Sequence, residues 1–491
     1  MRRKLYLETF GCQMNVLDSE LLLNQLRAIG YVQVLARDDA DVVIYNTCSV
    51  REHAEQKVWS RLGELREKKA ADPQLVIGVI GCMAEREGTS LFSRYPYLDV
   101  LCSPGELDKL PGMLQNAALS NLVAVGSKEK SEVRQVALMG RDSRRSTTLA
   151  AAEDTLEMLD LSRSFSPADG NRQAYVRITR GCNKFCSYCV VPYTRGAEVH
   201  RPPQNIIEEV KQLAAGGYVE VTLLGQTVNH YNYKHPDGST TTFADLLYQV
   251  HEATPNLPRL RFVTSFPRDF SDEALAAMRD CPRICRYLHI PAQSGSDRIL
   301  RMMNRGYTSA DYMNLIDRAR AMMPDISLAS DFIVGFPSET DAEFQETMEL
   351  AKYCRFKNSF IFKYSPRPRT QAAERYPDDV PDEVKRQRNT DLLALQSGIS
   401  AANIMAMVGQ TLDIMVEGEG SLTASAPAVA SGAVQLGWQK PPARVTGHKQ
   451  LIGRTRGDHI VAFDADPEII GQIASVTITA ARHMTLFGKL A

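Results

Sequence analysis

The chain has 491 residues, of which 44% are hydrophobic, and its formal net charge is −1. This length suits roughly three domains of about 150 residues, and the near-zero charge neither indicates nor excludes nucleic acid as a partner. Residues 1–8 reach an acidic residue before any long apolar stretch, and the longest apolar run, 75–84, is about half of a membrane span. Ten cysteines without a tight disulfide framework fit a reducing compartment. We therefore expect a cytoplasmic protein without a membrane partner.

The first predicted domain, residues 1–120, alternates short apolar runs with amphipathic stretches, which indicates a parallel α/β sheet with helices on both faces. We predict strands at 4–8, 41–45, 75–80 and 98–101, and helices at 15–29 and 51–69.

One cysteine follows each of the first three predicted strands: Cys12, Cys48 and Cys82. The carboxyl ends of parallel strands lie on one edge of a sheet, so these cysteines should converge. Three thiolates can hold an iron–sulfur cluster with one iron left open, whereas the alternative is three separate core cysteines. Cys102, after the fourth strand, is a possible further ligand, although we interpret it as a spare thiol.

Residues 121–171 lose periodicity and accumulate Ser, Arg, Asp and Gly, which predicts an interdomain linker. In the next domain, 172–404, six strand-like runs separated by helical patterns predict an open, partial (β/α)6 barrel. The runs are 175–179, 219–224, 260–264, 287–290, 328–334 and 359–364. Active sites of such barrels lie at the carboxyl ends of the strands, so we expect cofactor contacts from polar residues there. These residues are Gln226, Gln293, Ser294 and Asp331.

The first barrel strand leads into a second group of cysteines, Cys182, Cys186 and Cys189. The spacing C-x3-C-x2-C, with the aromatic Tyr188 before the last cysteine, is the radical S-adenosylmethionine signature. Three thiolates hold three irons of a 4Fe–4S cluster, and the fourth iron binds S-adenosylmethionine, whose cleavage gives a 5′-deoxyadenosyl radical; Tyr188 is a further expected cofactor contact. The alternatives are a zinc knuckle with a distant fourth ligand, or three unrelated core cysteines.

Basic residues are concentrated between residues 171 and 201, where Glu198 is the one acidic residue. They are Arg172, Arg177, Arg180, Lys184, Arg195 and Arg201. We consider two interpretations, an anionic partner near the cysteines or a solvated rim of loops.

The last predicted domain, 405–491, follows a charged helix at 382–403 and consists of short alternating strands, which indicates a small all-β module. The strands are expected at 411–417, 451–455, 459–464 and 474–479. Between the first two, residues 420–449 are rich in Ala, Ser, Gly and Pro, which predicts a flexible insertion.

With these residues identified, the chain resembles the radical-SAM methylthiotransferases, and among them the MiaB-type tRNA enzymes. The shared motifs lie at 8–15, 46–51, 81–84, 181–196, 293–296, 303–307 and 331–337, and the tail is similar to a TRAM module, an RNA-binding barrel. The resemblance implies two 4Fe–4S clusters. The cluster on Cys182, Cys186 and Cys189 would generate the radical, and the one on the amino-terminal trio would supply sulfur and accept a methyl group from a second S-adenosylmethionine.

The implied reaction is methylthiolation of C2 of N6-isopentenyladenosine at position 37 of tRNA, beside the anticodon. The implied partners are tRNA, an electron donor such as flavodoxin or ferredoxin, and the iron–sulfur assembly machinery. Methylthiolation of N6-threonylcarbamoyladenosine or of a ribosomal-protein aspartate remains an alternative, as does a non-catalytic iron–sulfur protein that binds RNA.

Three positions depart from the family pattern. Phe266 stands where a polar residue, usually His, is expected, while Ser338 and Arg369 stand where glycine is usual. The resemblance places these positions near the substrate pocket, so they bear on the choice of substrate rather than on the class of reaction.

Overall fold

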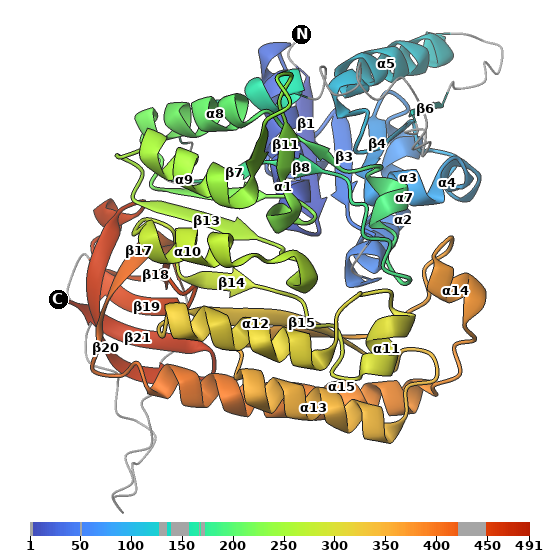
Figure 1. The fold of residues 1–491 in the computed structure, drawn as a ribbon. Helices are drawn as coiled ribbons and strands as arrows, with labels where there is room; N and C mark the ends of the chain where they lie inside the picture. Colours follow the sequence, from blue (N-terminus) through green and yellow to red (C-terminus); the bar gives the residue numbers. More distant parts are fainter. Residues whose placement is uncertain are drawn as a thin grey trace, which may run out of the picture.

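A computed structural model describes residues 3–49, 52–126, 135–138, 157–165, 167, 172–420 and 448–491. In these residues an α/β unit is followed by a six-stranded partial barrel and a small closed β-barrel (Figure 1). This order confirms the fold class predicted from the sequence. No helix of the described residues has the length and apolar character that a membrane crossing requires.

The amino-terminal sheet is parallel and has the strand order β2-β1-β3-β4-β5-β6. Its strands are β1 (Lys4–Phe10), β2 (Val32–Gln33), β3 (Val42–Thr47), β4 (Val76–Gly81), β5 (Val100–Cys102) and β6 (Val136–Leu138). Its helices are α1 (Gln13–Ala28), α2 (Glu52–Ala71), α3 (Cys82–Glu87), α4 (Ser90–Arg94) and α5 (Leu110–Gly126).

The central strands of this sheet are nearly continuous apolar runs because both of their faces are covered. Alternate residues enter two different cores. Val42 and Ile44 pack with residues of α1 and α5, whereas Val43 and Tyr45 pack with residues of α2 and α3. The centre of the sheet, formed by β3 and β4, is therefore buried on both faces.

The stretch 121–171 differs from the bare linker that its composition predicts. Helix α5 continues to Gly126, and β6 pairs in parallel with β5 at the edge of the amino-terminal sheet. Residues 157–161 are helical. A three-residue strand is too short to show a periodicity, which is why the sequence gives no sign of β6. Residues 127–134, 139–156, 166 and 168–171 lie outside the described part of the chain.

The partial barrel has six parallel strands in two sheets of order β13-β10-β7 and β14-β15-β16, and Leu260 and Ile284 form a bridge between them. The strands are β7 (Gln173–Arg177), β10 (Glu220–Leu224), β13 (Arg259–Val263), β14 (Tyr287–His289), β15 (Ser327–Val334) and β16 (Asn358–Lys363). Two short strand pairs accompany them, β8 (Thr179–Arg180) with β9 (Val199–His200), and β11 (Asn232–Lys234) with β12 (Thr240–Thr242).

The helices of the barrel begin where the sequence provides capping residues. Thr242, Thr308 and Thr340 each form a capping box with the acidic residue three positions later. The long helices are α8 (Pro203–Ala215), α9 (Phe243–Ala253), α10 (Asp272–Asp280), α12 (Ser309–Met322), α13 (Asp341–Cys354) and α15 (Asp382–Met405). Shorter helices are α7 (Val191–Thr194), α11 (Asp297–Met302) and α14 (Gln371–Arg375).

The carboxyl-terminal unit is a closed barrel with the strand order β17-β18-β19-β21-β20. Its strands are β17 (Thr411–Glu419), β18 (Lys449–Thr455), β19 (Ile460–Ala465), β20 (Ile473–Arg482) and β21 (Thr485–Leu490). The prediction omitted β21, whose short run of Thr, Leu, Phe, Gly and Lys alternates too weakly to be recognised. Most of the predicted insertion, residues 421–447, lies outside the described residues.

This small barrel packs against the amino-terminal ends of the strands of the partial barrel (Figure 1). Arg259, the first residue of β13, donates hydrogen bonds to the carbonyl oxygens of Arg454 (2.8 Å) and Asp413 (2.7 Å). Arg261 donates in the same way to Arg456 (3.0 Å) and Thr455 (2.6 Å). The small barrel therefore does not cover the carboxyl ends of the barrel strands, where active sites of such barrels lie.

Candidate functional site

The amino-terminal cysteines lie at the carboxyl ends of three adjacent strands. Cys12 follows β1 and caps α1, Cys48 follows β3, and Cys82 follows β4 as the first residue of α3. A hydrogen bond with the Cys48 thiol, helped by the charge of Arg195, lowers the pKa of Cys12 to about 6 despite its burial. The charges of Cys12 and Cys82 both act on the Arg195 side chain. These observations place the three thiols in one neighbourhood, as the strand order predicts.

Two glycines allow these loops to approach closely. Gly11 has φ +144°, and a Cβ there would lie 2.4 Å from Cys48 Cβ. Gly81 has φ +91°, and a Cβ there would lie 2.5 Å from Asn46 Oδ1. Asn15 donates to Asn46 Oδ1 at 2.8 Å, while Asn46 donates to the carbonyl oxygen of Asn15 at 2.9 Å. A close approach of loops that only glycine permits, fixed by a buried amide pair, fits a compact multi-thiolate ligand set.

Arg195 connects this trio to the partial barrel. Its guanidinium donates to Asp18 Oδ2 of α1 at 2.9 Å, and Arg177 of β7 pairs with the other carboxylate oxygen of Asp18. Burial lowers the pKa of Arg195, but the charges of Cys82, Asp18 and Cys12 outweigh it, so the net pKa is raised. A permanent cation therefore faces the thiols, and it would offset the negative charge of thiolates there.

The second trio lies in one loop after β7 and β8. Cys189 donates its backbone N–H to the carbonyl oxygen of Cys186 at 2.9 Å, which closes a turn, and the Cys182 sulfur lies 3.7 Å from Thr227 Oγ1. Burial, followed by the charges of the neighbouring thiols, raises the pKa of Cys189; burial likewise raises that of Cys182. Arg305 donates to the Cys186 sulfur at 3.3 Å. Two buried thiols and the half-buried Cys189, crowded beside a cation, fit a cluster that deprotonates them on binding.

The predicted cofactor contacts do not all face this loop. Gln226 follows β10, and its buried Oε1 has no partner among the described residues, so it is available to a ligand. Asp331 lies within β15, 3.0 Å from His289 Nε2. Gln293, with φ +71°, is joined through its backbone to β15. Ser294, however, turns toward α13, where its hydroxyl lies 3.4 Å from Thr347 Oγ1.

Tyr188 is half-buried and packs against two apolar clusters, the main barrel core and a smaller cluster with Phe336 and Tyr364. Its ring therefore helps to seat the cysteine loop on the barrel. Burial raises its pKa well above the ordinary value, so the phenol stays protonated.

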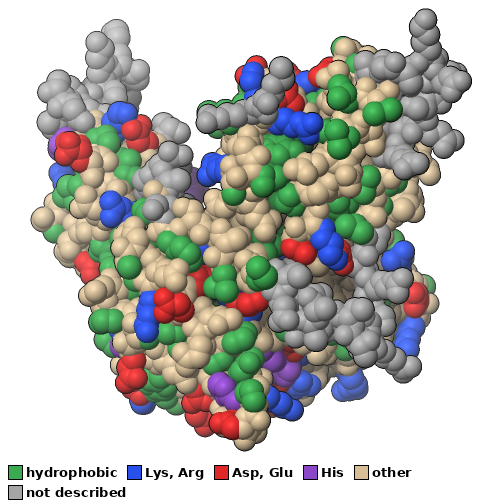
Figure 2. Space-filling model, turned by 90° about the horizontal axis from the view of Figure 1, so that it is seen from above, with side chains coloured by type: hydrophobic (Ala, Val, Ile, Leu, Met, Phe, Trp, Pro, Cys, Tyr) green, Lys and Arg blue, Asp and Glu red, His purple; other side chains and the backbone are tan. Residues whose placement is uncertain are grey.

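The basic residues between 171 and 201 form neither an anion-binding patch nor a solvated rim. Their partners are acidic residues from other segments, which a local count of charges cannot reveal. The pairs are Arg177–Asp18, Arg180–Asp160, Lys184–Asp269, Arg195–Asp18, Arg201–Glu157 and Arg201–Glu209, while Arg172 donates to the carbonyl oxygen of Gly217. On the face seen in Figure 2, basic and acidic side chains are interspersed.

The three departures from the family pattern have clear structural settings. Phe266 is buried, and the Arg305 guanidinium lies 4.4 Å from the centre of its ring, so an aromatic face supports the cation that donates to Cys186. Ser338 and Arg369 have φ +62° and +68°, so both keep the left-handed backbone for which glycine is suited.

Cys102 is set apart from the amino-terminal trio by its own hydrogen bonds. Its thiol donates to the carbonyl oxygen of Glu106 at 3.3 Å, and burial raises its pKa. A protonated thiol that uses its hydrogen on a backbone carbonyl supports the interpretation as a spare thiol.

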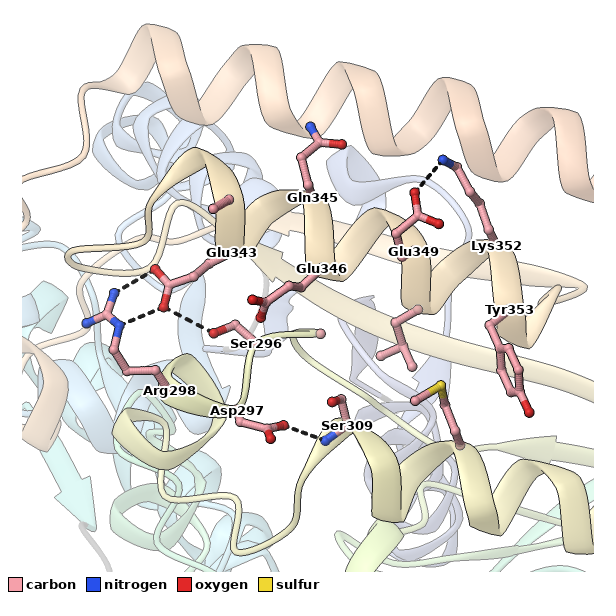
Figure 3. Close-up of a pocket in the computed structure, with 14 residues that line it drawn as sticks. Ser296, Asp297, Arg298, Ser309, Glu343, Gln345, Glu346, Glu349, Lys352 and Tyr353 are labelled. Atoms are coloured by element: carbon pink, nitrogen blue, oxygen red, sulfur yellow. Dashed lines mark hydrogen bonds and ion pairs between the residues drawn. The ribbon is translucent and has the colours of Figure 1, made fainter.

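A groove of about 970 Å³ lies on the outer layer of the barrel, between α11, α12 and α13 (Figure 3). Arg298 and Glu343 form an ion pair at one end (2.6 Å), and Glu346 and Glu349 line the wall. The cysteines, Gln226 and Asp331 do not line it. The groove is therefore separate from the strand ends that carry the candidate site.

Sequence reasoning placed Asn15, Arg195 and Arg305 within motifs, but it interpreted only Arg195, as one of the basic residues near the cysteines. The structure shows that they support the two trios, through the amide pair, the bridge to Asp18 and the hydrogen bond to Cys186, respectively. Their position inside the motifs was the one feature of the sequence that could have indicated a role at the site.

Comparison with known proteins agrees with this geometry. Three family models match the chain: Uncharacterized protein family UPF0004 at residues 4–103, the Radical SAM superfamily at 176–351 and the TRAM domain at 445–491. A tRNA-2-methylthio-N(6)-dimethylallyladenosine synthase from Rhodopirellula baltica is 43% identical over 100% of this chain and 96% of its own. Proteins of the same name from Syntrophotalea carbinolica and Neisseria gonorrhoeae are 38% and 40% identical, each over 99% of both chains.

The chain belongs to this synthase family. Like the other members of the Radical SAM superfamily, this synthase-family protein uses a 4Fe–4S cluster and S-adenosylmethionine. Among solved structures, the radical S-adenosylmethionine methyltransferase TsrM from Kitasatospora setae shares the fold with a TM-score of 0.51 and 15% identity, covering 76% of this chain and 77% of its own.

Proposed function

We propose that this protein methylthiolates C2 of N6-isopentenyladenosine at position 37 of tRNA. The observation that carries the proposal is the presence, in one chain, of two separate cysteine trios at the carboxyl ends of two parallel sheets. One trio serves radical formation, and a reaction that also inserts sulfur needs a second site for it. The names of the relatives supply the substrate.

In this proposal two 4Fe–4S clusters are held, one by Cys182, Cys186 and Cys189 and the other by Cys12, Cys48 and Cys82, and when bound they supply electron transfer to S-adenosylmethionine and transferable sulfur. Arg305, supported by Phe266, donates to the Cys186 sulfur and would orient it toward the cluster. Gln226 offers a free amide oxygen to the donors of the cofactor.

The amino-terminal trio is held in place by Arg195 and Asp18. Their ion pair joins α1 to the loop that follows the other trio, so the two ligand sets are tied by one buried contact. This ion pair would hold the sulfur-carrying site in a fixed position relative to the barrel in which the radical is made.

The carboxyl-terminal barrel would bind the tRNA. Its match to the TRAM domain supports this role. An electron donor such as flavodoxin or ferredoxin and the iron–sulfur assembly machinery complete the proposed set of partners, and a cytoplasmic location follows from the tRNA substrate.

The test is nucleoside mass spectrometry after reaction with isopentenylated tRNA, with threonylcarbamoylated and unmodified tRNA as controls. The wild-type chain should give 5′-deoxyadenosine and methylthio product from the isopentenylated tRNA. Cys48→Ala should still give 5′-deoxyadenosine but no methylthio product, because radical formation depends on the other trio. Cys102→Ala, which replaces a buried cysteine of the same sheet, should keep both outputs.

Product from the threonylcarbamoylated tRNA alone would replace the proposed substrate with the alternative one. Normal methylthio yields from Cys48→Ala over many turnovers would remove the sulfur-site assignment. An absence of 5′-deoxyadenosine from the reduced wild-type protein would favour a non-catalytic RNA-binding protein instead.

A further inference from the structure

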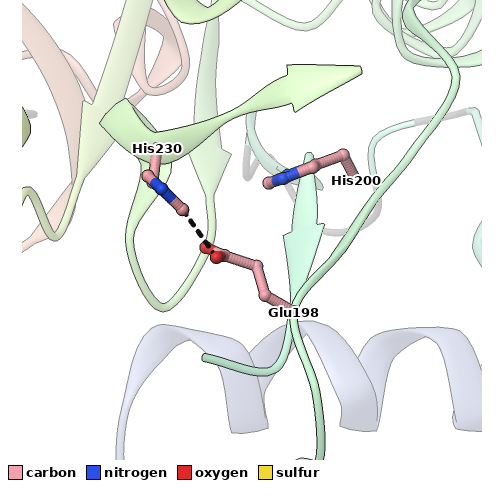
Figure 4. A group of neighbouring side chains, drawn as sticks. All are labelled: Glu198, His200 and His230. Carbon is pink, nitrogen blue, oxygen red and sulfur yellow. Dashed lines mark hydrogen bonds and ion pairs between the residues drawn. The ribbon is translucent and has the colours of Figure 1, made fainter. Parts of the chain in front are cut away.

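Three potential metal ligands, Glu198, His200 and His230, form one group (Figure 4). The group lies beside the cysteine loop, because the Glu198 backbone N–H donates to Asn183 Oδ1. One ligand atom from each residue lies within 4.8 Å of the others. Glu198 directly precedes β9 and His200 is its last residue, so the two side chains, two positions apart in extended chain, point to the same side. His230 comes from a different segment, the 3-10 turn Val228–His230 that follows β10.

The hydrogen bonds of this group are incomplete. The Glu198 side chain is 2% exposed, and its Oε2 lies 2.6 Å from His230 Nδ1. Its second oxygen, Oε1, is buried and has no partner among the described residues, and the same holds for His200 Nδ1. A buried carboxylate oxygen and a buried imidazole nitrogen without partners are unfavourable unless something satisfies them.

The chemistry of the three side chains indicates which ligand would satisfy these atoms. Two imidazoles and one carboxylate are a common ligand set for zinc and related divalent ions, with the fourth position open. Around a tetrahedral ion with metal–ligand bonds of about 2.0–2.2 Å, the ligand atoms lie about 3.3–3.6 Å apart. Binding would therefore draw the more distant ligand atoms of this group together by up to about 1.5 Å and would replace the Glu198–His230 hydrogen bond. The neighbouring cation Lys184 is already paired with Asp269, so its charge is offset.

We propose that Glu198, His200 and His230 bind one divalent transition-metal ion, zinc in the first instance, at a site distinct from both cysteine trios. The ion would connect two segments that border the Cys182 loop. Glu198 donates its backbone N–H to Asn183 Oδ1 at 3.2 Å, next to Cys182, whereas His230 follows Gln226 and Thr227 at the end of β10. Binding would therefore fix the cysteine loop against the strand end that carries Gln226. This inference goes beyond the proposed methylthiolation and does not depend on it.

The test uses the full-length protein with its clusters reconstituted, so that the cysteine thiolates are not available to zinc. Equilibrium dialysis against zinc, followed by elemental analysis, should show about one zinc ion per chain, and X-ray absorption should show nitrogen and oxygen ligands without sulfur. His230→Ala and Glu198→Gln should each weaken zinc binding at least tenfold. The His230 side chain is 41% exposed, so its replacement is compatible with folding, which circular dichroism would verify.

His235→Ala is the matched control, because His235 lies on the neighbouring hairpin and bonds to Thr241 Oγ1 (2.8 Å) rather than to this group. It should bind zinc as the wild-type protein does. Equal zinc affinity in the wild-type and His230→Ala proteins, or sulfur among the zinc ligands, would overturn the proposal.

Discussion

The two cysteine trios are assembled in different ways. Cys182, Cys186 and Cys189 come from one loop, so their spacing along the chain already fixes their proximity. Cys12, Cys48 and Cys82 meet only because β1, β3 and β4 are neighbours in one sheet. The first arrangement depends on local sequence, and the second depends on the folded domain.

Their electrostatic environments also differ. The pKa of Cys12 is lowered to about 6 by the Cys48 thiol and by Arg195, whereas burial raises the pKa values of Cys182 and Cys189. In the protein without clusters, Cys12 is therefore a thiolate at neutral pH, whereas Cys182 and Cys189 are thiols. Iron binds thiolates rather than thiols, so two sets of three cysteines can differ in the number of protons that they must lose when iron binds.

The largest expected effect is on the number of irons bound per chain, which should fall by half when either trio is removed. After anaerobic reconstitution the wild-type chain should hold about eight irons, and a Cys182/Cys186/Cys189→Ala variant about four, because two trios bind two four-iron clusters. The Cys12/Cys48/Cys82→Ala variant should also keep about four. Colorimetric iron analysis measures both. Loss of all iron from the first variant would show that the amino-terminal trio is not an independent site.

Breaking the buried tie between the trios should have the next largest effect. Asp18→Ala leaves Arg177 and Arg195 without their shared carboxylate, and removal of one partner from such a buried group costs about 3–5 kcal/mol. A shift of the urea unfolding midpoint measures the loss. Asp38→Ala, an exposed carboxylate of the same domain, should change stability by less than about 0.5 kcal/mol. Equal shifts for the two variants would contradict a buried tie.

The difference in thiol pKa predicts a difference in alkylation of the protein without clusters. Because the pKa of Cys12 is lowered, its thiolate is present above about pH 6, and its labelling by iodoacetamide should level off near pH 7. Below pH 6 the rate should fall about tenfold per pH unit. Cys182 and Cys189 should react only at higher pH, since their pKa values are raised.

Peptide mass spectrometry after timed quenching would follow each cysteine separately. Arg195→Gln should move the midpoint for Cys12 upward, because a positive charge that favours the thiolate is lost. If Cys12 and Cys189 were half-maximally labelled at the same pH, the proposed difference between their pKa values would be wrong.

The smallest expected effect is a change in fold stability caused by substitutions outside both trios. Arg369 is exposed and has φ +68°, so Arg369→Gly should relieve the left-handed strain and stabilise the fold by up to about 1 kcal/mol. Iron content should not change. Ser338→Gly, at φ +62°, should gain less, because Arg298 donates to the Ser338 hydroxyl at 3.0 Å and that bond would be lost. Thermal unfolding of the two variants, side by side, measures the difference.

Much of the fold could be predicted because strand periodicity and cysteine position are local properties of the sequence. The convergence of Cys12, Cys48 and Cys82 required only the rule that parallel strands end at one edge. Short strands escaped prediction. β6 has three residues, and β21 has a weak alternation, so neither shows a pattern above that of a loop.

The charges were the least predictable part of the site. Arg195 and Arg177 find Asp18, which lies far away in the sequence, and Arg201 finds Glu157. Only the folded chain brings these partners together, which is why a local excess of arginines gave the wrong picture of a charged surface. The orientation of Ser294 toward Thr347 depends in the same way on the position of α13.

The attachment of the carboxyl-terminal barrel has an evolutionary consequence. Arg259 and Arg261 bind it through carbonyl oxygens of the main chain at four residues, Asp413, Arg454, Thr455 and Arg456. Every amino acid provides the same carbonyl, so these four bonds place no selection on the side chains of the docked module. Other docking contacts do depend on side chains of the module, because Lys357 pairs with Asp458 at 2.6 Å and Gln173 donates to Glu417 at 3.1 Å. Selection for docking should therefore act on Asp458 and Glu417, whereas the four carbonyl contacts tolerate any side chain.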